Sequence, residues 1–316
     1  MLKRNIMGML DFIIDKVRPY PSGDRDPFAA ELKAAFHDIP VESVATASLS
    51  DEAWSRNANR LRELVLSREP REFLQWDVIA ATMFISNARF VSHELNYLRQ
   101  QPAWRGLYKS AIRESASGRP IPYLFHPASS GNLIHHAYHA ALFQEQSGVN
   151  IQDIDLVLEF GGGYGSMCRL FHNLGFNGRY LLFDLPAFSA LQRYYLRSIG
   201  LDVASESDGA ESLHGVFCIS DINQLQSLLS VTSSSGPALF LSTWALSESP
   251  LKTREQVTGL LSGFRLFLIA YQESFRELDN MEYFDAWKRG RQDIAWHDRR
   301  IEHIPGNNYL FGTAVS

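Results

Sequence analysis

The sequence is most informative at Val157-Leu158-Glu159-Phe160-Gly161-Gly162-Gly163-Tyr164-Gly165-Ser166. An apolar run ends in an acidic residue, and a glycine-rich turn then leads into a helical pattern. Glycine is needed where the backbone takes a positive φ and where a ligand lies against the main chain with no Cβ between them. Because open α/β folds bind ligands at the carboxyl ends of their strands, we expect a ligand at this turn.

Short apolar runs surround this turn and predict buried parallel strands at Leu156–Phe160, Tyr180–Phe183, Val216–Ile219, Ala238–Leu241 and Leu266–Ala270. The helical segments between them begin near Ser166, Pro186, Ile222, Thr253 and Asp279. This alternation predicts an α/β fold, a doubly wound Rossmann-like sheet with helices on both faces. A hairpin is expected at the end of the chain, with strands Arg300–Ile304 and Asn308–Val315, so the last strand runs antiparallel.

Residues 1–150 have helical periodicity instead. One amphipathic helix is expected from Ser50 to Pro70, a long buried helix over Phe73–Leu98, and a third from about Leu133 to Glu145. The chain is therefore predicted to divide into an all-helical N-terminal region, residues 1–150, and a ligand-binding domain, residues 151–316. We expect the helical region to cover the glycine-rich edge of the sheet.

Composition excludes several classes of protein. The 316 residues are 45% hydrophobic and carry a formal net charge of −5, which argues against a disordered chain and against a nucleic-acid partner. Cys168 and Cys218 lie in apolar runs and are expected to be buried thiols. The sequence has no apolar run of transmembrane length. Residues 1–19 are expected to form a short amphipathic helix rather than a secretory signal, which predicts a cytoplasmic protein.

The glycine spacing suggests which ligand binds. A dinucleotide fingerprint would place its third glycine at position 166, which is Ser166. The spacing of Glu159, Gly161, Gly163 and Gly165 instead resembles the first motif of class I S-adenosylmethionine (SAM)-dependent methyltransferases. SAM has no phosphate but carries an ammonium and a sulfonium, and the carboxylate of Glu159 suits that cationic end. A nicotinamide dehydrogenase is disfavoured by Ser166 and by the antiparallel last strand.

Other strand ends supply further cofactor candidates. Asp184 closes the strand after Glu159, where a carboxylate can accept hydrogen bonds from both ribose hydroxyls. Ser220 and Asp221 follow the third strand, where adenine is usually held, although Asp221 is equally suited to capping the next helix. Leu185 and Ser242 complete the predicted cofactor-binding set.

Several longer segments resemble the bacterial sugar O-methyltransferase family. They are residues 154–170 and 180–196, together with Thr243–Pro250, Pro305–Gly312 and Asn132–His139, so the resemblance spans roughly residues 120–316. It implies a SAM-dependent O-methyltransferase that acts on a nucleotide-linked or glycan-linked sugar, with a homodimer as a candidate assembly. The alternatives are an amino-group or non-sugar natural-product acceptor, and a SAM-binding partner protein without catalysis.

Methyl transfer to a hydroxyl needs a group that removes the proton. Glu248, His136 and His139 are the candidate catalytic residues, although Glu248 is equally suited to the first turn of the following helix. The histidines share helix faces but lack the glutamate and cysteine partners of a zinc site, so no metal is expected. Candidate substrate-binding residues are Trp244, Gln272, His135 and His303. Trp244 could stack on a sugar ring or simply be buried.

Overall fold

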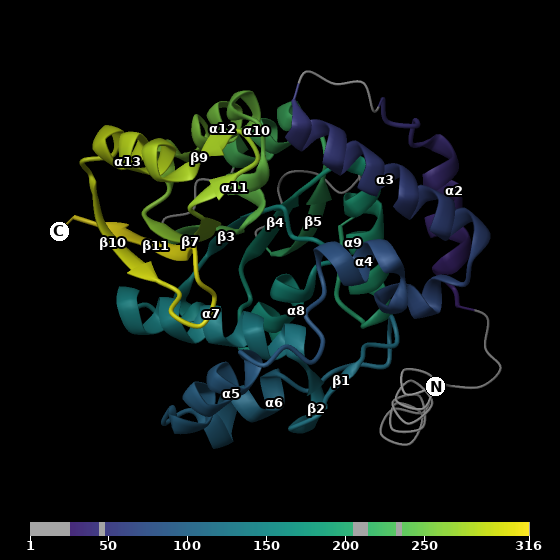
Figure 1. Ribbon diagram of the computed structural model, residues 1–316, viewed down its shortest axis with the longest axis horizontal. Helices are drawn as coiled ribbons and strands as arrows, with labels where there is room; N and C mark the ends of the chain where they lie inside the picture. Colours follow the sequence, from purple (N-terminus) through teal and green to yellow (C-terminus); the bar gives the residue numbers. More distant parts are fainter. Residues whose placement is uncertain (1–25, 44–47, 205–213, 232–235, 316) are drawn as a thin grey trace.

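The computed structural model describes residues 26–43, 48–204, 214–231 and 236–315 (Figure 1). The amphipathic helix expected at residues 1–19 lies outside the described residues. A sheet with strand order β10-β11-β7-β6-β3-β4-β5 forms the centre of the C-terminal half. The strands are β3 (Leu156–Phe160), β4 (Arg179–Phe183), β5 (Gly215–Ile219), β6 (Ala238–Thr243), β7 (Leu266–Gln272), β10 (Ile294–Arg300) and β11 (Asn307–Ala314).

The direction of the strands confirms the predicted fold class. Strands β3 to β7 are mutually parallel, whereas β11 is antiparallel to both of its neighbours, β7 and β10. The five predicted parallel strands are all present, because buried parallel strands are apolar on both faces and stand out as continuous runs. The sheet is thus a doubly wound Rossmann-like sheet with an antiparallel last strand.

Helices cover both faces of the sheet (Figure 1). Alternate residues of each strand belong to two separate apolar cores: Val157 faces one core, and Leu156 and Leu158 face the other. The first core is shared with α7 (Gly131–Ser147), α8 (Ser166–Asn173) and α9 (Pro186–Ser198). The second is shared with α10 (Ile222–Val231), α11 (Ala245–Glu248), α12 (Leu251–Thr258) and α13 (Asn280–Gly290). Cys168 and Cys218 are buried free thiols, as expected.

The N-terminal region is helical apart from a two-stranded hairpin, β1 (Pro122–Tyr123) and β2 (His126–Ser130). Its helices are α2 (Ala29–Asp38), α3 (Leu49–Ser67), α4 (Asp77–Thr82), α5 (Val91–Gln100) and α6 (Lys109–Ala111), with 3₁₀ or π turns at Pro70–Gln75 and Trp104–Tyr108. Buried side chains of this region, such as Phe36 and Phe73, join the same core as α7 to α9. One continuous apolar core includes residues on both sides of residue 150. The division of the chain into two domains at that residue stays a prediction.

The long helix predicted over Phe73–Leu98 is wrong. The chain instead forms the turn Pro70–Gln75, then α4 and α5, with an irregular loop over residues 83–90. The loop crosses α7 so closely that a Cβ on Gly131 would lie 1.9 Å from the Ser86 carbonyl oxygen. Its main chain is held by side chains, since the Ile85 amide donates to Asn132 Oδ1 at 3.2 Å. Apolar content predicted the burial but could not reveal this bend.

The first strand of the predicted terminal hairpin is misplaced. The predicted strand begins at Arg300, but β10 ends there, and the chain turns through Gly306, which has φ 76°, before β11. Strand β10 lies at the edge of the sheet, where residues such as His297 and Asp298 are exposed. An exposed edge strand lacks the apolar run that marks a central strand, so its sequence gives a weak signal.

Candidate active site

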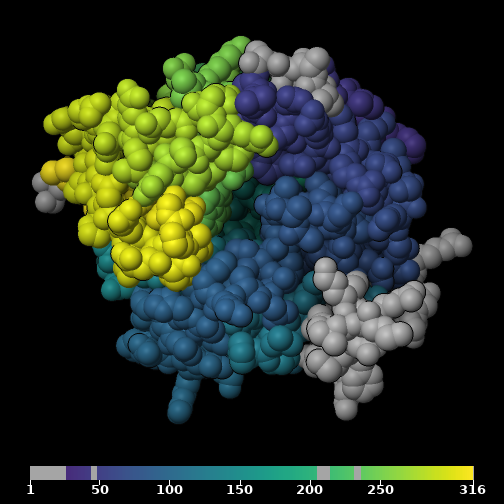
Figure 2. All heavy atoms as spheres, viewed as in Figure 1, coloured from purple at the N-terminus to yellow at the C-terminus, as the bar shows by residue number. Residues whose placement is uncertain are grey.

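A cavity of about 420 Å³ opens at the carboxyl edge of the sheet. It is lined by the glycine-rich turn and by the residues that follow β4, β5 and β6. The N-terminal region adds the first turns of α3, the last residues of α4 and part of the 83–90 loop. Figure 2 shows the surface hollowed where the N-terminal segments, in purple and blue, meet the green and yellow C-terminal half. Residues of the N-terminal region and of the glycine-rich turn therefore line the same cavity.

The glycine-rich turn requires glycine at several positions. Gly161, Gly163 and Gly165 have φ values of 74°, 57° and 93°, which side chains rarely adopt. A Cβ on Gly161 would lie 2.0 Å from the Cβ of Ala245. Gly161 and Gly163 line the cavity. Gly165 is instead the N-cap of α8 and packs against Leu196, so it shapes the turn and is not among the described lining residues.

Glu159, at the end of β3, is a buried carboxyl that lines the cavity. The Tyr180 hydroxyl donates a hydrogen bond to its Oε2 at 2.7 Å. Burial raises the pKa of Glu159 to about 8, because the charged form loses its hydration. A buried carboxyl with one hydroxyl donor is suited to a cationic ligand, which would stabilise the charged form.

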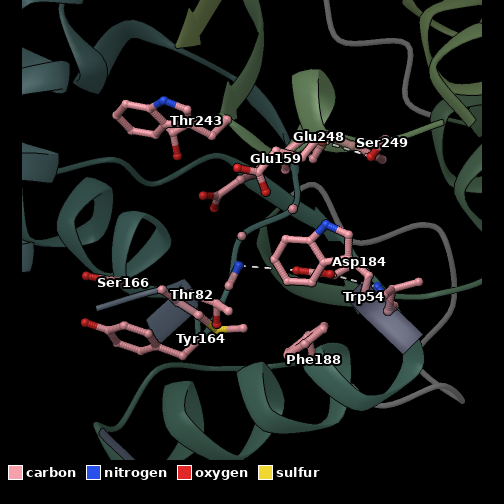
Figure 3. Close-up of a pocket in the computed structure, with 18 of the residues that line it drawn as sticks. Trp54, Thr82, Glu159, Tyr164, Ser166, Asp184, Phe188, Thr243, Glu248 and Ser249 are labelled. Carbon is pink, nitrogen blue, oxygen red and sulfur yellow. Dashed lines mark hydrogen bonds between the residues drawn. The ribbon is translucent and has the colours of Figure 1, made fainter. Parts of the chain in front are cut away.

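Asp184, at the end of β4, lies across the turn from Glu159 (Figure 3). Its Oδ2 accepts hydrogen bonds from the Gly163 amide at 3.2 Å and from Gln192 Nε2 at 2.9 Å. Burial raises the pKa of Asp184 to about 7, against the opposing effect of these donors. The neighbouring Leu185 also lines the cavity and is exposed.

The remaining predicted cofactor residues lie in three different settings. Ser220 lines the cavity. Asp221 is exposed and accepts a hydrogen bond from the Gln224 amide at 2.8 Å, which is the helix-capping role. Ser242 is buried, donating to the Phe160 carbonyl at 3.1 Å and accepting from the Leu246 amide at 3.0 Å. Asp221 and Ser242 are not among the described residues that line the cavity.

Trp244 connects β6 to α11 and lines the cavity, directly after Thr243 in the chain. Its backbone has φ 67°, an uncommon conformation for a side chain of this size, and such strain often marks a functional site. The indole nitrogen donates to Asn307 Oδ1 at 2.6 Å, and the ring stacks on His135 with centroids 5.5 Å apart. Of the two roles that the sequence allows for Trp244, its place in the cavity wall favours contact with a ligand over simple burial.

Glu248 lines the same cavity from α11 (Figure 3). Gln272 Nε2 donates to Glu248 Oε1 at 3.3 Å, and Gln272 Oε1 accepts from Ser247 at 2.9 Å. Burial raises the pKa of Glu248 above its ordinary value. The chain thus places Gln272 behind Glu248, and Gln272 itself is not among the described residues that line the cavity.

The four predicted histidines separate into two pairs. His135 and His136 line the cavity, whereas His139 and His303 are not among its described lining residues. His139 is buried, with its Nδ1 2.5 Å from the Tyr309 hydroxyl oxygen. His303 Nε2 lies 2.8 Å from Glu94 Oε1. Within the described residues, no group of three or more His, Cys, Asp or Glu side chains is arranged to hold a metal ion.

Sequence reasoning missed the part of the cavity wall that comes from the N-terminal region. Trp54 packs against Phe188 with ring centroids 5.8 Å apart, and both lie beside Asp184 (Figure 3). Met83 approaches Gly163, since a Cβ added there would lie 3.4 Å from its side chain. Trp54 follows the helical spacing of α3, which is typical of an ordinary core residue, so its spacing alone does not predict a place in the cavity wall. Only the packing of α3 over the sheet brings it to the cavity.

Strand order and the antiparallel β11 define the Rossmann-like class I methyltransferase fold. No family model matches the sequence, and no curated protein matches it. Among the described residues, no helix is both long enough and apolar enough to cross a membrane.

Solved structures with a similar fold include three methyltransferases of low sequence identity. The small RNA methyltransferase HEN1 has a TM-score of 0.40 and 13% identity, and the match covers 58% of this chain but only 25% of that one. Magnesium protoporphyrin IX methyltransferase from Synechocystis PCC 6803, solved with bound SAM, has a TM-score of 0.40 and 10% identity over 78% and 95% of the chains. An rRNA methylase from Streptococcus thermophilus has a TM-score of 0.37 and 12% identity over 58% and 95%.

Proposed function

We propose that the protein is a SAM-dependent O-methyltransferase. The observation that carries this proposal is the glycine-rich turn, in which Gly161 and Gly163 take positive φ values between the buried Glu159 carboxyl and the half-buried Asp184 carboxyl, both of which line one cavity. The lining fits SAM because it presents the Glu159 and Asp184 carboxyls to a cationic ligand, while glycine at positions 161 and 163 lets the turn pack against Ala245 and Met83. SAM supplies an electrophilic methyl group on a sulfonium when it is bound.

Cofactor contacts follow from the positions of these groups. Asp184 accepts hydrogen bonds from the ribose hydroxyls, and Glu159 balances the cationic end of SAM. Trp54, Leu185 and Phe188 supply apolar surface beside Asp184 for the adenine ring. A dinucleotide is a poorer fit, because its fingerprint would have a third glycine at position 166, where this chain has Ser166.

The charge of the residues that line the cavity also limits the chemical class of acceptor that can bind there. Four carboxyl side chains line the cavity, and among its described residues there is no lysine or arginine; the four are Asp51, Glu159, Asp184 and Glu248. An anionic acceptor would lack a cation to balance its charge. We therefore propose a sugar hydroxyl without a nearby phosphate, which favours a glycan-linked sugar over a nucleotide-linked one. Trp244 offers an apolar face to the sugar ring, and Glu248 and His136 contact its hydroxyls.

An amine acceptor is the second candidate. Glu248 and Asp51 lie on the part of the lining that the proposed cofactor contacts do not use, and Ser50 hydrogen-bonds the Glu248 carbonyl, so the start of α3 and α11 are adjacent. Two carboxyls on a cavity wall whose described residues include no lysine or arginine are suited to an ammonium group. An amino sugar could be the acceptor for either candidate function. It would be methylated on a hydroxyl oxygen in the first and on its amino nitrogen in the second.

Acceptor profiling with methyl-labelled SAM tests the proposal. The protein is incubated with panels of neutral glycans, amino sugars, sugar nucleotides and non-sugar amines, and the labelled products are located by mass spectrometry. We expect label on a hydroxyl of a neutral or amino sugar. Label on nitrogen would favour the second candidate. Label only on sugar nucleotides would contradict the charge argument, and SAM binding without transfer to any panel would contradict the enzymatic function.

A further inference from the structure

A buried polar network lies beside the cavity and joins three separate elements. Glu94 of α5 has its Oε1 2.7 Å from His135 Nδ1, in α7, and 2.8 Å from His303 Nε2, in the connection between β10 and β11. The side chains of Glu94 and His135 are 0% and 1% exposed. Burying a carboxylate and an imidazole costs free energy of folding unless the two groups pair. Here one member of the pair also lines the cavity.

Within this network, His135 is the member that lines the cavity. Because its Nδ1 faces a carboxylate oxygen, Nδ1 carries the proton and Nε2 is left as an acceptor, an assignment that follows from the hydrogen-bond partner. Nε2 is buried and has no hydrogen-bond partner. A buried acceptor without a hydrogen-bond partner costs free energy. A hydroxyl donor on a ligand would supply the hydrogen bond to Nε2 that the protein does not make.

The imidazole ring of His135 is fixed from several sides. Trp244 stacks on it at 5.5 Å with an interplanar angle of 21°, Phe90 packs edge-on at 5.5 Å, and His139 packs edge-on at 4.1 Å between centroids. Trp244 is itself held by its hydrogen bond to Asn307. A base held in one orientation by packing and by a carboxylate meets the geometric requirement for preorganised proton transfer.

The other histidines of α7 are poorer bases. Burial lowers the pKa of His136 to about 3, and burial lowers the pKa of His139 well below its ordinary value. Among the described residues, neither imidazole is hydrogen-bonded to a carboxylate: His139 Nδ1 faces the Tyr309 hydroxyl, and His136 Nδ1 has no partner. Burial would raise the pKa of Glu94, but the interactions with His135 and His303 outweigh it and hold that pKa below its usual value. The Glu94 carboxylate is therefore ionised and stabilises a proton gained by the imidazole beside it.

We propose that His135 is the general base of methyl transfer and that Glu94 is the positioning residue that orients it, a proposal that rests on the function proposed above. The acceptor oxygen forms a bond to the methyl carbon while the carbon–sulfur bond breaks, and its electron pair stays on sulfur as the thioether S-adenosylhomocysteine. The hydroxyl proton goes to His135 Nε2. The positive charge thus passes from the sulfonium to an imidazolium that is hydrogen-bonded to Glu94.

Kinetics of His135→Asn test the base. Asparagine keeps a donor near the position of Nδ1 but has no counterpart of Nε2. We expect kcat to fall by about 100- to 10,000-fold, the usual contribution of a general base, while SAM affinity changes by less than about twofold. In His135→Ala, added imidazole is expected to restore at least about tenfold of the lost rate. His297→Asn, on the exposed strand β10, is the control and should keep wild-type kcat.

Glu94→Gln tests the positioning role, since it keeps the shape of the side chain and removes its charge. We expect kcat to fall by about 10- to 1,000-fold with KM within about threefold, because the wrong tautomer is favoured while the acceptor still binds. A merely structural role would lower the melting temperature and raise KM together. Glu94→Asp, which keeps the charge, should retain more activity than Glu94→Gln.

Nitrogen NMR of the imidazoles gives a readout that needs no turnover. His135, assigned by the loss of its signals in His135→Asn, is expected as the Nδ1-protonated tautomer, and Glu94→Gln should change that pattern. An Nε2-protonated His135, or a His135→Asn variant with wild-type kcat, would overturn the proposal even if the enzyme transfers methyl groups. If the wild type binds SAM but transfers no methyl group, the proposed function fails and the base assignment fails with it.

Discussion

Glu159 and Asp184 are the residues on which the proposed cofactor site depends. Each is a carboxyl at the end of a parallel strand, Glu159 buried and Asp184 half-buried, and burial raises the pKa of both, to about 8 and about 7. Carboxyls with pKa values shifted by burial are concentrated at the functional sites of proteins. The free protein therefore keeps, near neutral pH, protons that a cationic ligand would displace.

Asp184→Ala should weaken SAM binding by about 10- to 100-fold, because two ribose hydroxyls would lose a charged acceptor. The matched control is Asp221→Ala. Asp221 caps α10 from an exposed position, so its loss should cost about 1 kcal/mol of stability and leave SAM affinity unchanged. Isothermal titration calorimetry and thermal unfolding measure both effects. Equal affinities in the wild type and Asp184→Ala would remove Asp184 from the site.

SAM binding should strengthen as the pH rises. Below a pKa of about 7 for Asp184 and about 8 for Glu159, burial keeps these groups protonated in the free protein, whereas bound SAM favours the ionised forms. Binding thus releases protons, and affinity should rise from about pH 6 to about pH 9 and then level off. Calorimetry in buffers of different ionisation enthalpy counts the protons. A pH-independent affinity with no proton release would show that neither carboxyl changes its protonation on binding.

At the scale of elements, the turn between β3 and α8 sets the shape of the site. It lies against α11, because a Cβ on Gly161 would reach the Ala245 side chain at 2.0 Å. The chain must therefore have glycine here for two reasons: the positive φ and the contact with α11. At Gly200, φ is 84° and no atom lies within 4 Å of an added Cβ, so only the positive φ favours glycine there.

Gly161→Ala and Gly200→Ala separate these two effects. Gly200→Ala should cost about 1 kcal/mol, the strain of a left-handed alanine. Gly161→Ala should cost about 1–3 kcal/mol more, because α11 must move to make room. It should also lower SAM affinity. Urea unfolding and SAM titration of both variants supply the comparison. Similar losses of stability in both variants would contradict the close packing of Gly161 against α11.

Much of the fold could be predicted because buried parallel strands are unbroken apolar runs. The predicted β3 matches the observed Leu156–Phe160. The 83–90 loop could not be predicted, since its bend depends on a contact with Gly131 that lies far along the chain. The same limit holds for the site. Glu159 and Asp184 belong to a local motif, but the pairing of Glu94 with His135 joins α5 to α7 and has no sequence pattern.

At the scale of the whole molecule, one apolar core joins the N-terminal helices to the sheet. Phe36 of α2 and Phe73 belong to the same core as Val157 of β3 and Phe311 of β11. A buried ion pair adds to this connection, since Arg169 of α8 pairs with Glu114, which precedes β1. Because N-terminal residues also line the cavity, the two halves form the site together.

Residues 151–316 expressed alone should therefore not fold to a SAM-binding protein. Removal of residues 1–150 would expose the apolar face that α8, α9 and the sheet share with the N-terminal helices and α7. We expect loss of cooperative thermal unfolding by circular dichroism and of SAM binding. A fragment that unfolds cooperatively and binds SAM with full affinity would support two independent domains divided near residue 150.

Calorimetric titration of the 316-residue chain with SAM and with S-adenosylhomocysteine tests the central claim most directly. The cavity, with its two carboxyls and its glycine cradle, predicts one binding site per chain, with a dissociation constant at or below about 100 μM for both ligands. A parallel titration with NADH should give no saturable heat. Absence of binding at millimolar SAM, or preferential binding of NADH, would contradict the assignment of this cavity to SAM.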